Sequence, residues 1–243
     1  EVSTEATYTF TATEDAELVA NFKATIITLT TGNNDAVIAA NIGNTVDVVI
    51  ERSFTANDGY YTLCVPFNMP ASVIGKAYSI GTITEHVAGE GININLKEES
   101  ELSAGVPYLV LPKANMTELV VENVTIEPDN ASIQVVGDPD LNVNIEFQGF
   151  YSAPAAPENQ TNGTTQYYVG NNGFLYNEVV DIRGLCGLFT ITNGEGQAIS
   201  NVRARVVAGE NVETGVEDII TTDAPTKVIE NGQLIIIRDG VKY

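Results

Sequence analysis

The stretch LVVENVTIEPDNASIQVVGDPDLNVNIEFQGF, residues 119–150, decides the fold class of this chain. It holds three runs rich in Val and Ile, at 119–126, 132–136 and 144–150. Pro, Asp, Asn and Gly stand between the runs, and these residues favour turns. Side chains such as Val and Ile fit a pleated, half-buried surface, so the pattern predicts three strands joined by turns.

The same pattern continues outward in both directions along the 243 residues. Further strands are predicted at 8–13, 17–22, 24–30, 45–51, 60–67, 91–96, 108–111, 166–170, 173–176, 187–192 and 202–207. Helix is scarce: the best candidate is residues 35–41, with Asn34 or Asp35 as N-cap and Gly43 beyond the end, followed by one turn at 71–74. Closely spaced strands without helical patterns between them predict an all-β, antiparallel β-sandwich-like body.

The C-terminal segment KVIENGQLIIIRDGVKY, residues 227–243, predicts a separate β-meander. Asn231-Gly232 and Asp239-Gly240 are strong two-residue hairpin turns, because each needs a positive φ. We therefore expect a β segment at 1–22, a main sandwich at 23–207, an acidic linker at 208–225 and the meander at 226–243. The alternative is that the meander covers its apolar middle strand with the main body, a neighbouring chain or residues 216–220.

The charge of the chain argues against two classes of partner. The net charge is −21, and the eleven Lys and Arg residues form no cluster in the sequence. Nucleic acid and anionic membrane surfaces both attract basic patches, so neither is an expected partner. No stretch approaches the roughly 18 apolar residues of a membrane helix, and no signal peptide opens the chain, which favours a mature fragment without direct membrane insertion.

A catalytic set is not recognisable. His86 is the only histidine, and neither a GxSxG elbow nor an HExxH motif occurs. One histidine and two distant cysteines do not have the spacing of zinc ligands, and no cofactor is expected. The acidic turns at 33–35, 98–101 and 138–140 match no known calcium loop, so solvated turns are expected there and calcium binding is the alternative. Cys64 and Cys186 are expected to be reduced and buried apart, although a disulfide between them is the alternative.

The candidate ligand-binding residues are the tyrosines near the loop at 153–165. Tyr151, Tyr167, Tyr168 and Tyr176, with Phe174, form the main aromatic concentration in the sequence. Such rings can present a stacking platform to a sugar, or they can pack in the core and in cross-strand pairs. A glycosidase would need paired carboxylates, which 32 acidic residues neither exclude nor indicate.

Several segments resemble a known kind of surface protein. YYTLCVPFNMP (60–70) and LSAGVPYLVLP (102–112), with 33–54 before them and NGQLIIIRDGVKY (231–243) at the end, resemble a module of secreted proteins from Bacteroides-type gut bacteria. YTFTATEDAELVANF (8–22) is similar to the last strands of an internalin-type B repeat, also called a Listeria–Bacteroides repeat. The resemblance implies a non-catalytic, extracytoplasmic module, secreted or on the cell surface, with a role in adhesion or interaction. A carbohydrate-binding module of a surface glycan-handling system is the alternative, and the partner is a host or bacterial surface protein or glycan.

Overall fold

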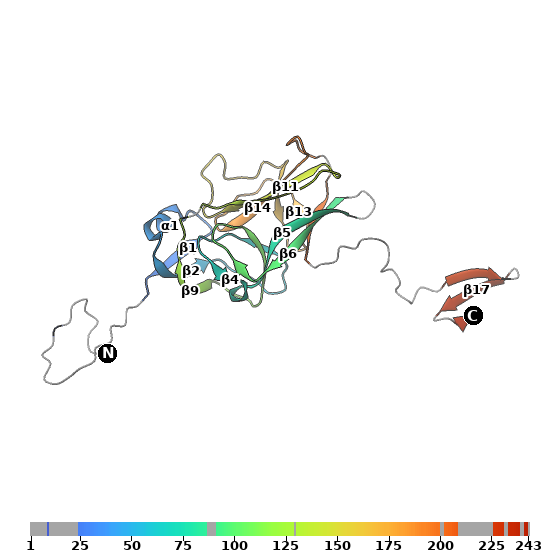
Figure 1. Ribbon diagram of the computed structural model, residues 1–243, viewed down its shortest axis with the longest axis horizontal. Coiled ribbons are helices and arrows are strands. Elements are labelled where there is room, and N and C mark those ends of the chain that lie inside the picture. The colour runs from blue at the N-terminus through green and yellow to red at the C-terminus, as the bar shows by residue number, and fades with distance from the viewer. Residues whose placement is uncertain are drawn as a thin grey trace, which may run out of the picture.

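The structure is a computed structural model that describes Thr9, residues 24–86, 91–128, 130–199 and 202–208, and the backbone of three strands between 226 and 242. Strands dominate the described chain, which confirms the all-β, sandwich-like fold (Figure 1). One α-helix, α1 (Asp35–Asn41), and one 3-10 turn, η1 (Ala71–Val73), are present in this part of the chain. The three larger sheets of the body form three successive layers.

The first sheet contains β1 (Ile26–Thr30), β2 (Thr45–Glu51) and β9 (Leu119–Thr125), in the order β1-β2-β9. The β1 and β2 strands are parallel, which corrects the expectation of a wholly antiparallel body. Parallel neighbours need a crossover between them, and α1 supplies it. The helix has the expected bounds and ends before Gly43, whose φ of +77° suits a glycine beyond a helix end.

The central sheet has five strands in the order β15-β6-β5-β8-β3. Its members are β3 (Tyr61–Leu63), β5 (Gly75–His86), β6 (Gly91–Glu99), β8 (Tyr108–Pro112) and β15 (Ala204–Ala208). The β15 strand lies parallel to β6, a second exception to the expected antiparallel pairing. Two short strands, β4 (Met69–Pro70) and β7 (Glu101–Leu102), pair beside η1.

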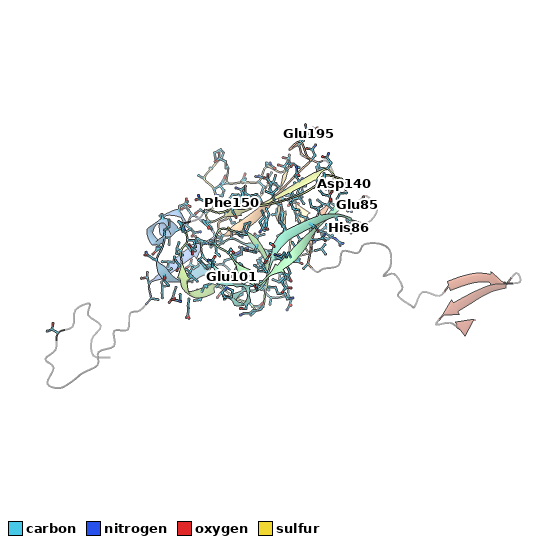
Figure 2. All side chains as sticks on the ribbon, viewed as in Figure 1. Glu85, His86, Glu101, Asp140, Phe150 and Glu195 are labelled. Carbon is cyan, nitrogen blue, oxygen red and sulfur yellow. The ribbon has the colours of Figure 1, made fainter. Side chains whose placement is uncertain are left out.

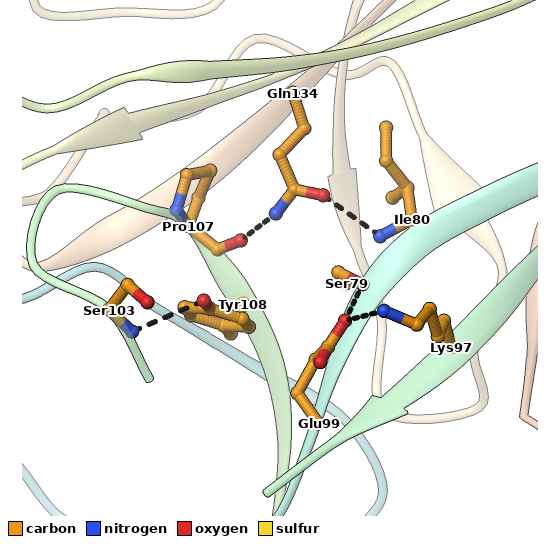
Figure 3. Close-up of polar contacts among 8 residues, drawn as sticks. All are labelled: Ser79, Ile80, Lys97, Glu99, Ser103, Pro107, Tyr108 and Gln134. Carbon is orange, nitrogen blue, oxygen red and sulfur yellow. Dashed lines mark hydrogen bonds and ion pairs between the residues drawn. The ribbon is translucent and has the colours of Figure 1, made fainter. Parts of the chain in front are cut away.

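The outer sheet has the order β10-β11-β14-β12-β13 and is antiparallel throughout. Its members are β10 (Ile133–Asp138), β11 (Val143–Phe150), β12 (Gln166–Val169), β13 (Leu175–Tyr176) and β14 (Cys186–Thr192). Figure 3 shows how Gln134 ties β10 to the central sheet: its amide donates to the Pro107 carbonyl and accepts from the Ile80 N–H at 3.1 Å.

The central sheet separates two hydrophobic cores. On one face, Tyr108 and Val110 of β8 pack with the first sheet and with Phe54, Leu63 and other buried side chains; we term this the first core. On the other face, Leu109 packs against the outer sheet in the second core. A strand buried on both faces carries a continuous apolar run rather than an alternation, which explains the sequence YLVLP in β8.

The second core is built from regularly alternating strands. The rings of Phe147 and Phe189, which are directly paired on β11 and β14, stack with their centroids 4.3 Å apart. Gly149 and Gly187 form another pair on the same two strands. A Cβ on Gly187 would lie 2.4 Å from the Phe147 ring, so glycine leaves the space that this ring fills.

Two expectations about strands need correction. The segment expected at 60–67 is extended only at β3, because the chain turns at Pro66, although Leu63, Val65 and Phe67 are all buried in the core. The long β5 strand was not predicted. Its register shifts between Ile80 and Ile83, and this irregularity breaks the alternation that identifies strands.

The expected C-terminal meander is confirmed as paired strands. The β16 strand (Thr226–Glu230) pairs with β17 (Gln233–Arg238), which pairs with β18 (Val241–Lys242), both antiparallel. The turn residues themselves lie outside the described residues, as do the strands expected at 8–13, apart from Thr9, and at 17–22. The linker expected at 208–225 lies outside them except for Ala208, so the domain boundaries stay a prediction.

Both cysteines are free, as expected, but their burial differs. Cys64 is fully buried, whereas Cys186 is half-buried, which corrects the expectation that both are buried. Cys64 packs at Gly149, and Cys186 is paired with Phe150, the next residue of β11. The two thiols interact electrostatically, but no disulfide joins them.

Candidate functional site

Two of the four candidate tyrosines belong to the cores. Tyr167 is 5% exposed and lies in the second core, and Tyr151 is partly buried against the first core. The ring of Tyr167 cannot present its face to a large ligand, whereas Tyr151 is half-buried. For these two residues the packing alternative describes their environment.

The other two tyrosines form a surface pair, in which Tyr168 is half-buried and Tyr176 is 37% exposed. Tyr168 on β12 is paired with Tyr176 on β13, and their rings stack with centroids 5.7 Å apart and planes 28° apart. The Tyr168 hydroxyl donates to Glu178 at 3.1 Å, and the Tyr176 hydroxyl accepts from the Asn172 amide at 2.8 Å. Because Tyr167 and Tyr168 are consecutive, one faces the core and the other faces outward.

Tyr168 also lines a pocket of about 470 Å³, within the range typical of small-molecule sites. We term it the tyrosine–arginine pocket. It lies where the end of β2 and the start of β3 meet β12 and β14. Its lining residues are Thr31, Glu51, Arg52, Ser53, Tyr60, Tyr61, Thr62, Tyr168, Val169, Asn171, Arg183 and Gly187.

Arg52 is held in place by the chain around it. Its Nη1 donates to the Thr62 carbonyl at 2.7 Å and to the Leu185 carbonyl at 3.0 Å. The guanidinium also lies over the rings of Phe54, at 5.1 Å, and Tyr61, at 5.8 Å. These contacts fix the guanidinium before any ligand arrives, which lowers the entropy cost of binding.

No carboxylate forms an ion pair with the arginines of the pocket within the described chain, although Glu51 also lines it. The two ion pairs found among the described residues join Lys76 to Glu98 and Lys97 to Glu99. Although Arg52 as a residue is half-buried, its guanidinium is enclosed, and this burial lowers its pKa below the ordinary value. The positive charge of Arg183 lowers the Arg52 pKa further, while Cys186 and Tyr61 raise it. The pocket thus concentrates unpaired positive charge.

Tyr60 forms a second aromatic wall of the pocket. Its ring meets that of Tyr78 edge to face, with centroids 6.3 Å apart. Burial raises the Tyr60 pKa, and Tyr78 raises it further, so the hydroxyl is a neutral hydrogen-bonding group near pH 7. The pocket therefore combines aromatic rings, a fixed cation and neutral polar groups.

The histidine and the two cysteines do not gather into a reactive set in the described chain. His86 ends β5 (Figure 2), and its buried Nδ1 has no hydrogen-bond partner among the described residues. Burial raises the pKa of both thiols, an effect that Arg52 partly offsets at Cys186. Among the described residues, three or more potential metal ligands nowhere come together, and no helix is long and apolar enough to cross a membrane.

Comparison with known proteins identifies no relative of this chain. No protein-family model, no curated protein and no solved structure matches it.

Of the pocket residues discussed above, the sequence predicted Tyr168 but not Arg52, Tyr60 or Arg183. Tyr168 was found through the local concentration of aromatic residues. Arg52, Tyr60 and Arg183 were missed, because they lie far apart in the chain and the fold alone brings them together. The absence of a basic cluster in the sequence did not exclude a basic cluster in space.

Proposed function

We propose that this chain is a non-catalytic extracytoplasmic module, secreted or on a cell surface, that binds a partner through the tyrosine–arginine pocket. The observation that carries this proposal is Arg52, fixed by hydrogen bonds and without an ion-pair partner among the described residues, beside the half-buried tyrosine rings of a pocket large enough for a small ligand. Preorganised polar groups among aromatic walls are typical of binding sites.

The chemistry of the described chain supports binding rather than turnover. Thiols with raised pKa values are poor nucleophiles near pH 7, because the thiolate is the reactive form. Glu51 is the one carboxylate among the residues that line the pocket, whereas glycoside hydrolysis uses two. The resemblance of 60–70 and 102–112 to modules of Bacteroides-type surface proteins supports the cellular location.

A carbohydrate is the favoured partner class within this proposal. Tyr60 and Tyr168 offer aromatic faces, and Asn171, Thr31 and Glu51 offer hydrogen-bonding groups around them. A sugar presents an apolar C–H face and a rim of hydroxyls, which this combination can match. A protein partner stays the alternative for the same surface.

A glycan array, combined with a panel of hydrolase substrates, tests the proposal. We expect glycan binding that Tyr168→Ala abolishes, with no product formed from any bound glycan. The matched control is Tyr176→Ala, which removes the stacked neighbour of Tyr168 from outside the pocket lining and should weaken binding less. Turnover that is lost on changing one carboxylate would contradict the non-catalytic assignment.

A further inference from the structure

The tyrosine–arginine pocket places two guanidinium groups in a chain with a net charge of −21. Arg183 is exposed, and its side chain has no hydrogen-bond or ion-pair partner among the described residues. From this arrangement we infer that the pocket selects a saccharide that carries a carboxylate. The inference rests on the proposed function, because it names the ligand class of the same pocket.

The bonding of Arg52 leaves one edge of its guanidinium available. The Nη1 hydrogens are used by the carbonyls of Thr62 and Leu185. The Nε and Nη2 hydrogens have no partner in the part of the chain that the structure describes. These two nitrogens form an edge that matches the two oxygens of a carboxylate in parallel hydrogen bonds.

An anion would also relieve an unfavourable charge arrangement. Arg183 and Arg52 repel one another, and the guanidinium of Arg52 is withdrawn from water. An enclosed charge is costly without a counterion, and 32 acidic residues in the sequence could have supplied one. A bound carboxylate between the two arginines supplies that counterion from the ligand.

The rest of the lining indicates a sugar acid rather than a simple carboxylate. The rings of Tyr60 and Tyr168 and the polar group of Asn171 exceed what a small anion needs. Glu51 would repel a second negative charge but can accept hydrogen bonds from hydroxyls. One carboxylate on a ring with several hydroxyls therefore fits the charge and the walls together.

Titration with methyl β-D-glucuronide and methyl β-D-glucoside tests this inference, because the two probes differ at the C6 carboxylate alone. We expect the glucuronide to bind about tenfold or more tightly than the glucoside, since a charge-assisted pair is gained. Arg183→Gln should remove this preference. Arg203→Gln, which removes an exposed arginine outside the pocket lining, should keep it.

The other outcomes separate this inference from the proposed function. Equal binding of the two probes would overturn selection for a carboxylate but leave a carbohydrate-binding pocket intact. Equal weakening by Arg183→Gln and Arg203→Gln would reveal attraction to charge in general and would also overturn it. If neither probe binds, but the array finds a neutral glycan whose binding is abolished by Tyr168→Ala, the inference fails and the proposed function stands. If neither probe nor any glycan on the array binds, the inference and the carbohydrate form of the proposal both fail.

Discussion

The two cores on either face of the central sheet are held together differently. The second core lies between two five-stranded sheets, and regular alternation supplies its side chains. The first core lies between a three-stranded sheet and the central sheet, and it also includes side chains from irregular chain, such as Val65 and Leu185. That irregular chain is fixed by single polar side chains, such as Asn34 and Arg52, which bond to backbone groups. The comparison teaches that apolar volume stabilises one core, whereas the other also depends on individual hydrogen bonds.

The largest loss of stability should come from removing a large side chain from the second core. Phe147 is fully buried and stacked on Phe189, so Phe147→Ala should lower the free energy of unfolding by about 3–5 kcal/mol. Denaturant unfolding measures this change. The control is Phe174→Ala, at a ring that is 40% exposed, which should cost much less. Equal losses for the two variants would contradict the assignment of Phe147 to a packed core.

Removing a buried polar side chain from the first core should lower the free energy of unfolding almost as much. Asn34 is 2% exposed; its Oδ1 accepts from the Thr30 N–H at 2.8 Å, and its Nδ2 donates to the carbonyls of Thr30 and Tyr151. Asn34→Ala leaves these buried groups without partners, so we expect a loss of about 2–3 kcal/mol. Asn44→Ala, at an exposed asparagine whose side chain has no hydrogen bond among the described residues, should change stability by less than about 0.5 kcal/mol. A loss below 1 kcal/mol for Asn34→Ala, on the order of a surface change, would show that the first core does not depend on this side chain.

A smaller effect should appear at alkaline pH. The pKa of Cys64 is raised by burial, so the folded state binds this proton more tightly than the unfolded state does. Its contribution to stability is present below the unfolded pKa of about 8.5 and is lost as pH rises above it. We expect unfolding free energy to fall by about 1 kcal/mol per pH unit between pH ~9 and ~10, where ordinary tyrosines are still mostly protonated.

Cys64→Ala should reduce this alkaline slope while costing some stability at every pH, because it leaves a small cavity. Cys186→Ala is the comparison, since burial raises that pKa but Arg52 opposes the shift. A slope that neither substitution reduces would place the titrating group elsewhere.

The smallest effect is expected from removing residues 221–243. If the C-terminal meander is a separate unit, the shortened chain should keep the melting midpoint of the body within the error of the measurement. The reason is that its described strands pair with one another, and the sequence has Asn-Gly and Asp-Gly between them, which favour hairpin turns. A large fall in the melting midpoint would show that the meander belongs to the body.

Local patterns explain what could be predicted from the sequence. The helix at Asp35–Asn41 and the strand at Thr45–Glu51 were predicted with their correct bounds, because periodicity and end signals lie within each segment. The β5 strand was missed where a bulge breaks its period, and the pairing of β15 with β6 depends on contacts between distant segments. Arg52 and Arg183 are likewise brought to one pocket by contacts between distant segments, so the sequence alone did not indicate them as site residues.

The most direct test of the account is a map of amide chemical-shift changes on addition of a glycan that the array identifies. We predict that the largest shift changes occur at residues of the tyrosine–arginine pocket, while the interiors of both cores change little. The pocket residues concerned are Arg52, Tyr60, Tyr168, Asn171 and Arg183. A second hollow of about 510 Å³, lined by Asn68, Pro70, Val73 and residues 120–124, supplies the contrast. Changes concentrated there, with none at the two arginines, would contradict the claim that the tyrosine–arginine pocket is the binding site.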